Sequence, residues 1–182
     1  MLFEDLKSLE NNEKISKNDV LKILKKWAEN VSVFDIMNST TRFRESCKYV
    51  QKEYKGYFDE IYVKNFYMRV KDILKDKNNY NDNVNRKLFL KAIEYFQKQD
   101  SEMEISNKLY DKEEVIESHR LIYYLICIYT TFILDEPIHH VGSTFPGHTK
   151  VRYENGKYYC PVKNNNINNL KAVCRFCIAK QG

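Results

Sequence analysis

The amino-acid sequence predicts a mainly α protein: a helical bundle with a small C-terminal subdomain made of a β-hairpin and a helix. Residues 1–136 contain one glycine and no proline, whereas residues 137–182 contain four glycines and all three prolines. Because both residue types interrupt helices, we expect helix before residue 137 and turns after it. Apolar residues also recur at helical spacing through the first part. We therefore predict a helical body, 1–136, and a Cys/His-rich tail, 137–182, packed together as one domain.

The helical body divides into successive amphipathic segments. Ser16, three residues before Asp19, is typical of a helix N-cap. Apolar spacing predicts helices over 2–9, 20–28, 33–50, 54–74, 88–96 and 115–134, with a polar connection at 78–85. The last of these helices contains the apolar run 121–134, which at 14 residues is shorter than the roughly 20 that a membrane span needs. We expect it to be the buried centre of the bundle.

The tail is expected to contain a β-hairpin. Asn155-Gly156 separates residues 150–154 from residues 157–160, and Asn-Gly is the preferred pair for a tight type I′ turn. The asparagine-rich stretch 164–169 is expected to be a loop. Residues 170–180 place Leu170, Val173, Cys174, Cys177 and Ile178 on one side of a predicted final helix.

Charge and cysteine content narrow the possible function classes. The formal net charge is only +5, and both signs alternate along the chain, so nucleic-acid binding is possible but not indicated. The N-terminus lacks the pattern of a secretion signal. Five cysteines, an odd number, favour reduced thiols or metal ligands over a disulfide framework. We therefore expect a cytoplasmic protein that does not act on a membrane.

The tail contains the residues that could bind a metal. Cys160, Cys174 and Cys177 lie within a short stretch that also holds three histidines, His139, His140 and His148. Zinc prefers four sulfur or nitrogen ligands, and a Cys-x-x-Cys pair with a third cysteine and one histidine provides such a set. A metal would also organise a segment that is too short to build much core of its own. The histidine ligand stays open on this reasoning.

Two other interpretations of the cysteines remain. Cys174 and Cys177 also fit the apolar side of the predicted final helix, where free cysteines are often buried as small core residues. The same pair could act as a redox dithiol, although its predicted position beyond the first helical turn does not favour an activated thiolate. Cys47 and Cys127 lie on helical apolar patterns without companions and are expected in the core.

The tail also resembles a known family in three places: residues 139–147 (HHVGSTFPG), residues 158–163 (YYCPVK) and residues 174–177 (CRFC). These motifs resemble those of an uncharacterised family of methanogenic archaea, a domain of unknown function. The resemblance implies an anaerobic archaeal cytosol and supplies no activity. Its defining positions match the three cysteines and His139, so it implies His139 as the fourth ligand, with His140 in reserve.

The resemblance also makes an iron–sulfur cluster an alternative to zinc, because three cysteines and a histidine can hold one in an anaerobic cell. The usual ferredoxin spacings of cysteine are absent, which favours zinc. Three thiolates and an imidazole fill a tetrahedral site and leave no position for water. We therefore expect a zinc-binding protein with a structural or binding role. Its partner, and whether it is an enzyme, stay open.

Overall fold

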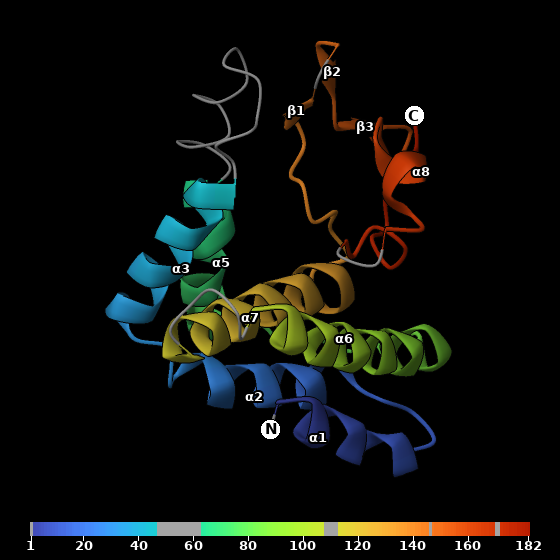
Figure 1. Ribbon diagram of the computed structural model, residues 1–182. Coiled ribbons are helices and arrows are strands. Elements are labelled where there is room, and N and C mark those ends of the chain that lie inside the picture. The colour runs from blue at the N-terminus through green and yellow to red at the C-terminus, as the bar shows by residue number, and fades with distance from the viewer. Residues whose placement is uncertain (1, 47–62, 108–112, 146, 170–171) are drawn as a thin grey trace.

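The computed structural model describes residues 2–46, 63–107, 113–145, 147–169 and 172–182. Helices make up most of the chain before Pro137, and short strands follow it (Figure 1). The strands lie together at one end of the molecule, and α1 and α2 lie at the other end. The predicted mainly α class is confirmed.

The chain begins with α1 (Leu2–Lys7), a 3-10 helix η1 (Ser8–Asn11) and α2 (Lys17–Ala28). Ser16 caps α2 as predicted: its hydroxyl accepts a hydrogen bond from the Asp19 backbone N–H at 3.0 Å and donates one to the Asp19 carboxylate at 2.7 Å. The cap satisfies one of the N–H groups that the first turn of a helix leaves without a partner. It thereby fixes where α2 begins.

Three more helices follow: α3 (Val33–Ser46), α5 (Val63–Lys75) and α6 (Arg86–Asn107). Helices α3 and α5 agree with the predicted helices where the structure describes them, whereas α6 continues beyond the predicted 88–96 to Asn107. The predicted helical residues 47–50 and 54–62 lie outside the described residues. Cys47, expected in the core, lies outside them too. The connection before α6 is non-helical, as predicted, and its Asn83 forms an isolated antiparallel bridge with Ser16.

The buried centre of the bundle is α7 (Glu113–Ile128), which continues as a π-helix, η4 (Tyr129–Ile133). The wider turn is visible in its hydrogen bonds: the Leu134 N–H donates to the Tyr129 carbonyl at 3.1 Å, five residues back. The Glu136 N–H reaches six residues back to Thr130. The segment ends at Asp135, whose φ of 52° is left-handed. Sequence periodicity predicted the helix but not this change in its winding.

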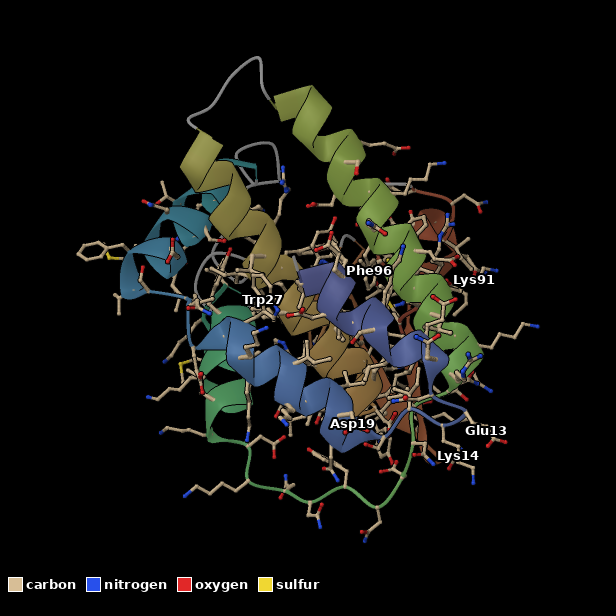
Figure 2. The ribbon with its side chains drawn as sticks, turned by 90° about the horizontal axis from the view of Figure 1, so that it is seen from below. Glu13, Lys14, Asp19, Trp27, Lys91 and Phe96 are labelled. Carbon is tan, nitrogen blue, oxygen red and sulfur yellow. The ribbon has the colours of Figure 1, made fainter. Side chains whose placement is uncertain are left out.

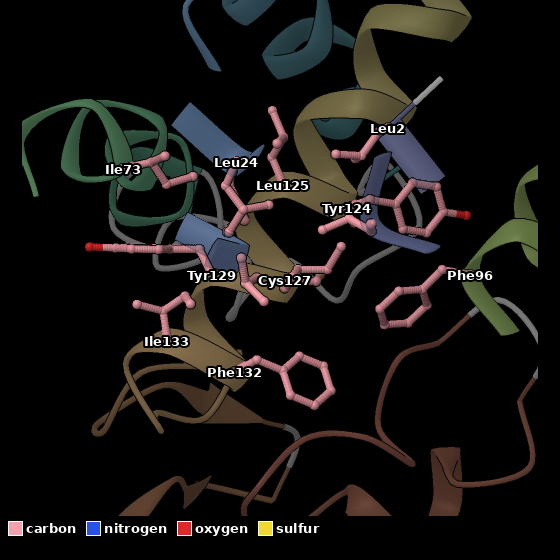
Figure 3. Close-up of a cluster of buried hydrophobic side chains, with 14 of the residues drawn as sticks. Leu2, Leu24, Ile73, Phe96, Tyr124, Leu125, Cys127, Tyr129, Phe132 and Ile133 are labelled. Carbon is pink, nitrogen blue, oxygen red and sulfur yellow. The ribbon is translucent and has the colours of Figure 1, made fainter. Parts of the chain in front are cut away.

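Helices α2, α3, α5 and α6 all contact α7. Figure 3 shows side chains from several of these helices meeting around it, among them Leu24, Ile73 and Phe96. The Tyr124 ring lies 5.1 Å from Phe3 and 5.5 Å from Phe96, centroid to centroid, which is the range of favourable aromatic pairs. Cys127 is buried in this core, so the prediction for that residue is confirmed.

A buried carboxylate holds the connection between α5 and α6 against the centre. Asp76 accepts hydrogen bonds from the hydroxyls of Tyr80, at 2.8 Å, and Tyr129, at 2.9 Å. Lys17, itself buried, forms ion pairs with Asp82 at 2.7 Å and Asp135 at 2.5 Å. A buried charge is tolerated when it is paired in this way. These contacts join the start of α2, the 78–85 connection and the end of η4.

The outer surface of α1, α2 and α6 is charged. Figure 2 shows Glu13 and Lys14, in the connection before α2, extending away from the ribbons, whereas Phe96 of α6 is buried. The indole N–H of Trp27 donates a hydrogen bond to the Asp5 carboxylate at 2.8 Å. Within the described ranges, we find no helix with both the length and the apolar content required to cross a bilayer.

The tail forms two small sheets. Strand β1 (Thr144–Phe145) pairs antiparallel with β2 (Thr149–Lys150). Strand β3 (Arg152–Glu154) pairs antiparallel with β4 (Lys157–Cys160), and β4 pairs parallel with β5 (Lys180–Gln181). Val151 joins the sheets: its N–H donates to the Ser143 carbonyl at 3.0 Å, and its carbonyl accepts from the Gly142 N–H at 2.9 Å. The predicted hairpin is confirmed, with Asn155 and Gly156 in its turn.

The predicted helix over residues 170–180 is wrong. The described residues of this stretch form turns and then β5, which adds a third strand to the hairpin. A free strand edge leaves backbone groups without partners, and pairing with β5 satisfies those of β4. The predicted loop 164–169 also differs, because a short helix, α8 (Lys163–Asn166), begins there. The apolar spacing that suggested the final helix instead places residues in two separate cores.

The tail packs on the body through its last segment. Val173 and Phe176 are buried in the main core, where the Phe176 ring lies 5.5 Å from Phe96 and 5.4 Å from Tyr95. Val151, Cys160 and Ala179 form a second, smaller core inside the tail. The division into a helical body, 1–136, and a tail, 137–182, packed together as one domain stays a prediction.

The hairpin turn provides the first test. Asn155 and Gly156 have φ values of 51° and 73°, both left-handed. We predict that Gly156→Val lowers the free energy of unfolding by about 1–3 kcal/mol, because a β-branched residue is strained at positive φ. Asn155→Gly keeps the turn accessible and serves as the control. Denaturant unfolding of the three proteins measures the effect, and equal midpoints would contradict the turn.

Candidate metal centre

The four residues predicted to bind metal line one pocket between the body and the tail. The pocket has a volume of about 210 Å³. His139 and the three cysteines come from three separate segments of the chain. The full lining consists of Phe43, Tyr123, Ile138, His139, Cys160, Lys163, Ala172, Val173, Cys174 and Cys177.

The turn that carries Cys174 and Cys177 is fixed by its neighbours. The Phe176 N–H donates to the Val173 carbonyl at 3.0 Å, which closes the turn, and both of these side chains are buried in the main core. Apolar burial of the intervening residues thus holds the two thiols at the pocket. The Cys-x-x-Cys spacing therefore belongs to a tight turn and not, as predicted, to one side of a helix.

Cys160 and His139 reach the pocket from other elements. Cys160 is the last residue of β4, and its carbonyl accepts a hydrogen bond from the Gly182 N–H at 3.3 Å, next to the β4–β5 pairing. The His139 ring packs edge-to-face on Phe145 of β1, with centroids 5.2 Å apart. Each donor is therefore positioned by contacts of its own with the surrounding structure.

Lys163, at the start of α8, fastens the cysteine turn from the other side. Its ammonium donates to the Cys177 carbonyl at 2.7 Å and to the Ala179 carbonyl at 2.5 Å. A charged donor makes stronger hydrogen bonds than a neutral one. Lys163 therefore orients the segment that contains Cys177 and places a positive charge beside the thiols.

The electrostatics of the pocket favour the uncharged forms of Cys160, Cys174 and His139. Burial, together with the neighbouring Cys177 and Cys160, raises the pKa of Cys174 to about 11. Burial also raises the pKa of Cys160. Burial and the nearby His140 lower the pKa of His139 to about 4. At neutral pH the imidazole is thus in the neutral form that binds metal, whereas the thiols must release protons to do so.

The donors share a pocket without yet forming a coordination sphere. Among the described residues, no three His, Cys, Asp or Glu side chains are grouped closely enough to hold a metal ion as they stand. The donor types fit zinc, but their present separation does not. Convergence of the three sulfurs to roughly 4 Å from one another, as one ion requires, stays a prediction.

The two reserve histidines lie elsewhere. The Nδ1 of His140 is 3.3 Å from the Ser143 hydroxyl, and its Nε2 is 3.5 Å from the Asn65 amide. Burial and the Arg69 guanidinium lower the pKa of His140. His148 is exposed and lines a groove on the outside of the tail. The structure therefore brings only His139 of the three histidines to the cysteines.

Sequence reasoning missed several residues that matter here. Phe43 and Tyr123 form an apolar wall opposite the thiols, and no local pattern pairs α3 with residue 160. His119 of α7 belongs to a polar chain inside the body: its Nδ1 lies 2.7 Å from the Ser39 hydroxyl. The same hydroxyl lies 2.7 Å from the Tyr67 hydroxyl. Ser39 is fully buried, so this chain cross-links α3, α5 and α7.

Comparison with known proteins gives a family without an assigned activity. The profile described as "Uncharacterized protein conserved in archaea (DUF2115)" matches residues 16–182. A UPF0305 protein of Methanothermobacter thermautotrophicus is 34% identical over 167 residues, 92% of this chain and 97% of that protein. UPF0305 proteins of Methanocaldococcus jannaschii and Methanococcus maripaludis are 30% and 29% identical over 86% of this chain and 91% of each relative. No solved structure matches.

The half-buried His139 provides a test by pH. A pKa of about 4, against an ordinary 6.5, means that the unfolded chain takes up a proton before the folded one does. Metal-free protein should therefore lose up to about 3 kcal/mol of stability as pH falls from 6.5 to 4. His139→Phe keeps a ring against Phe145 and should flatten this dependence, while His148→Gln should not. An identical pH profile for His139→Phe and the unmutated chain would show that the pKa of His139 is not lowered by folding.

Proposed function

We propose that this chain, which belongs to the archaeal family DUF2115, binds one zinc ion through Cys160, Cys174, Cys177 and His139. The observation that carries the proposal is that these four residues line a single pocket although they come from three separate segments. Three thiolates and one neutral imidazole make up a common tetrahedral donor set for zinc. The family description assigns no activity, so the chemistry of the site is the basis for the proposal.

The ion would join the body to the tail. His139 follows the end of the helical region, Cys160 ends β4, and the two remaining thiols lie on the turn held in the main core. A metal shared by these segments would limit their separation more strongly than the small tail core does. The donors must move together when zinc binds, so binding should tighten this junction.

The proposed role is structural or binding, not catalytic. Four protein ligands leave no coordination position for water or substrate. The raised pKa of Cys174 and that of Cys160 add a proton cost to zinc binding, so affinity should fall as pH falls. A reduced, metal-bound set of thiols also suits a cytoplasmic location, which is part of the proposal.

Two alternatives use the same residues. An iron–sulfur cluster could be held by three thiolates and the imidazole, while a redox dithiol would need only Cys174 and Cys177. The dithiol is less favoured, because the pKa of Cys174 is raised and a thiolate is the reactive form. The described part of this segment also lacks a helix N-terminus, which commonly activates such a pair.

Elemental analysis of protein purified without oxygen tests the proposal directly. We expect about one zinc per chain and no visible absorption band. Iron in excess of zinc, with a band in the visible range, would assign a cluster instead. Absence of both metals, also after zinc is added and excess zinc removed, would leave the cysteines as core residues or as a dithiol.

A pair of matched substitutions tests the ligand role of Cys174. Cys127 is a buried thiol of the helical core and serves as the control, whereas Cys174 is half-buried. Without a metal, changing the Cys174 sulfur to a hydroxyl should cost no more than the same change at Cys127, about 1–3 kcal/mol. With zinc, Cys174→Ser should cost clearly more, because it removes a ligand that joins the tail to the body.

Limited proteolysis gives the second measurement on these two variants. Cys174→Ser should be cut first between Pro137 and Asn169 while the body survives, and a strong chelator should produce the same pattern in the unmutated protein. Cys127→Ser should keep the protection of the unmutated tail. Equal stability losses, with a tail indifferent to chelator, would rule out the metal.

A further inference from the structure

The positive charge of this protein is concentrated in its tail. Residues 137–182 contain seven Lys and Arg and a single acidic residue, Glu154. Residues 1–136 contain 23 Lys and Arg against 24 Asp and Glu. The two signs alternate along the body, but the excess that makes the whole chain +5 comes from the tail alone. A strongly basic small subdomain attracts polyanions.

A groove on the tail gathers part of this charge next to an exposed aromatic ring. The groove has a volume of about 520 Å³ and its wall includes His148, Lys150, Arg152 and Tyr153. Tyr153 is 55% exposed, although an aromatic side chain of this size is more often covered. Its ring pairs with Tyr158 across the hairpin, with centroids 4.7 Å apart, which holds it in place. The groove therefore combines cations with a fixed stacking surface.

The face of the three-stranded sheet that carries Arg152 adds further cations, whereas Tyr153, the next residue of β3, lies on the opposite face with Tyr158. Arg152 of β3 and Lys180 of β5 are both register partners of Tyr159 on β4. Register partners share one face of a sheet, so a tyrosine lies between two cations in this row. Lys157, two residues before Tyr159 on the same strand, lies on that face as well. Glu154 pairs with Arg152 at 3.2 Å and is the only acidic side chain in the tail.

We propose that the groove binds single-stranded nucleic acid along the edge strand β3, where residues from both sheet faces line it, with Lys150 and Arg152 contacting phosphates and a base stacking on Tyr153. Cations along a groove together with exposed aromatic rings are the features by which proteins bind single strands without sequence preference. A base-paired duplex hides the faces of its bases, and an acidic peptide has no planar base to stack. The proposal does not rest on the zinc site, because none of its contacts involves the four donors.

The chain offers a matched control surface. A second groove, of about 480 Å³, lies on α2 and includes Lys22, Lys25 and Lys26 in its wall, without an aromatic residue. Helix α2 lies at the end of the molecule away from the strands (Figures 1 and 2). Removing two cations from either groove lowers the net charge equally, so a difference in binding between the two variants shows which groove binds the nucleic acid. Lys22 and Lys26 are exposed and suit the purpose.

The experiment measures binding of short fluorescein-labelled oligouridylate and oligodeoxythymidylate to the full chain by fluorescence anisotropy, over a range of salt. We expect affinity to fall as salt rises, with a logarithmic slope of about 0.7 per phosphate contact. Lys150→Gln/Arg152→Gln should weaken binding about tenfold or more and, by removing two phosphate contacts, reduce the slope by about 1.4. Lys22→Gln/Lys26→Gln should change neither quantity by as much. Tighter binding of one oligomer would identify RNA or DNA as the ligand.

Tyr153→Leu separates stacking from charge. It keeps an apolar side chain at this position, and thermal melts verify that each variant is folded. We expect at least about a fivefold loss of affinity with an unchanged salt slope, because a leucine side chain cannot stack on a base as an aromatic ring does. Three results would overturn the proposal: full affinity in Tyr153→Leu, equal losses in the two double variants, or equal competition by polyglutamate or a duplex of the same length.

Discussion

Burial of α7 and its π-helical extension is the constraint on which the other elements depend. From Leu121 to Ile133 this segment is mostly apolar and largely buried, so it can lose its contact with water only if neighbours cover it on all sides. Helices α2, α3, α5 and α6 provide this cover with the apolar sides of amphipathic sequences. The same segment fixes where the tail starts, since Asp135 and Glu136 are tied to Lys17 and Arg69 of the body.

The sequence was most informative where one local rule decides the structure. Apolar periodicity identified the helices, the Ser16 cap marked the start of α2, and Asn155-Gly156 gave the hairpin. It failed in residues 170–180. There, strand pairing with β4 and packing of Phe176 on Phe96, a ring far away in the sequence, decide the structure, and local spacing does not. The π-helix was missed for a similar reason, because its winding depends on tertiary packing and not on any residue pattern.

The same holds for the candidate site: local residue types could be predicted from the sequence, whereas their arrangement in space could not. Residue types indicated His139 and the three cysteines, and all four line one pocket. Their separation, the wall formed by Phe43 and Tyr123, and the hold of Lys163 on the Cys177 carbonyl depend on how the tail packs against the body. The kinds of ligand can thus be predicted from the sequence, whereas the distances between them depend on how the chain packs.

The π-helix over Tyr129–Ile133 sets the direction in which the chain continues after it. One residue of an α-helix turns the chain by about 100°, so the wider winding over Tyr129–Ile133 changes the direction in which the backbone leaves the bundle. A chain shortened by one residue here would send Ile138 and His139 toward a different side of α7. The number of residues in this segment therefore sets the direction in which the tail leaves the bundle.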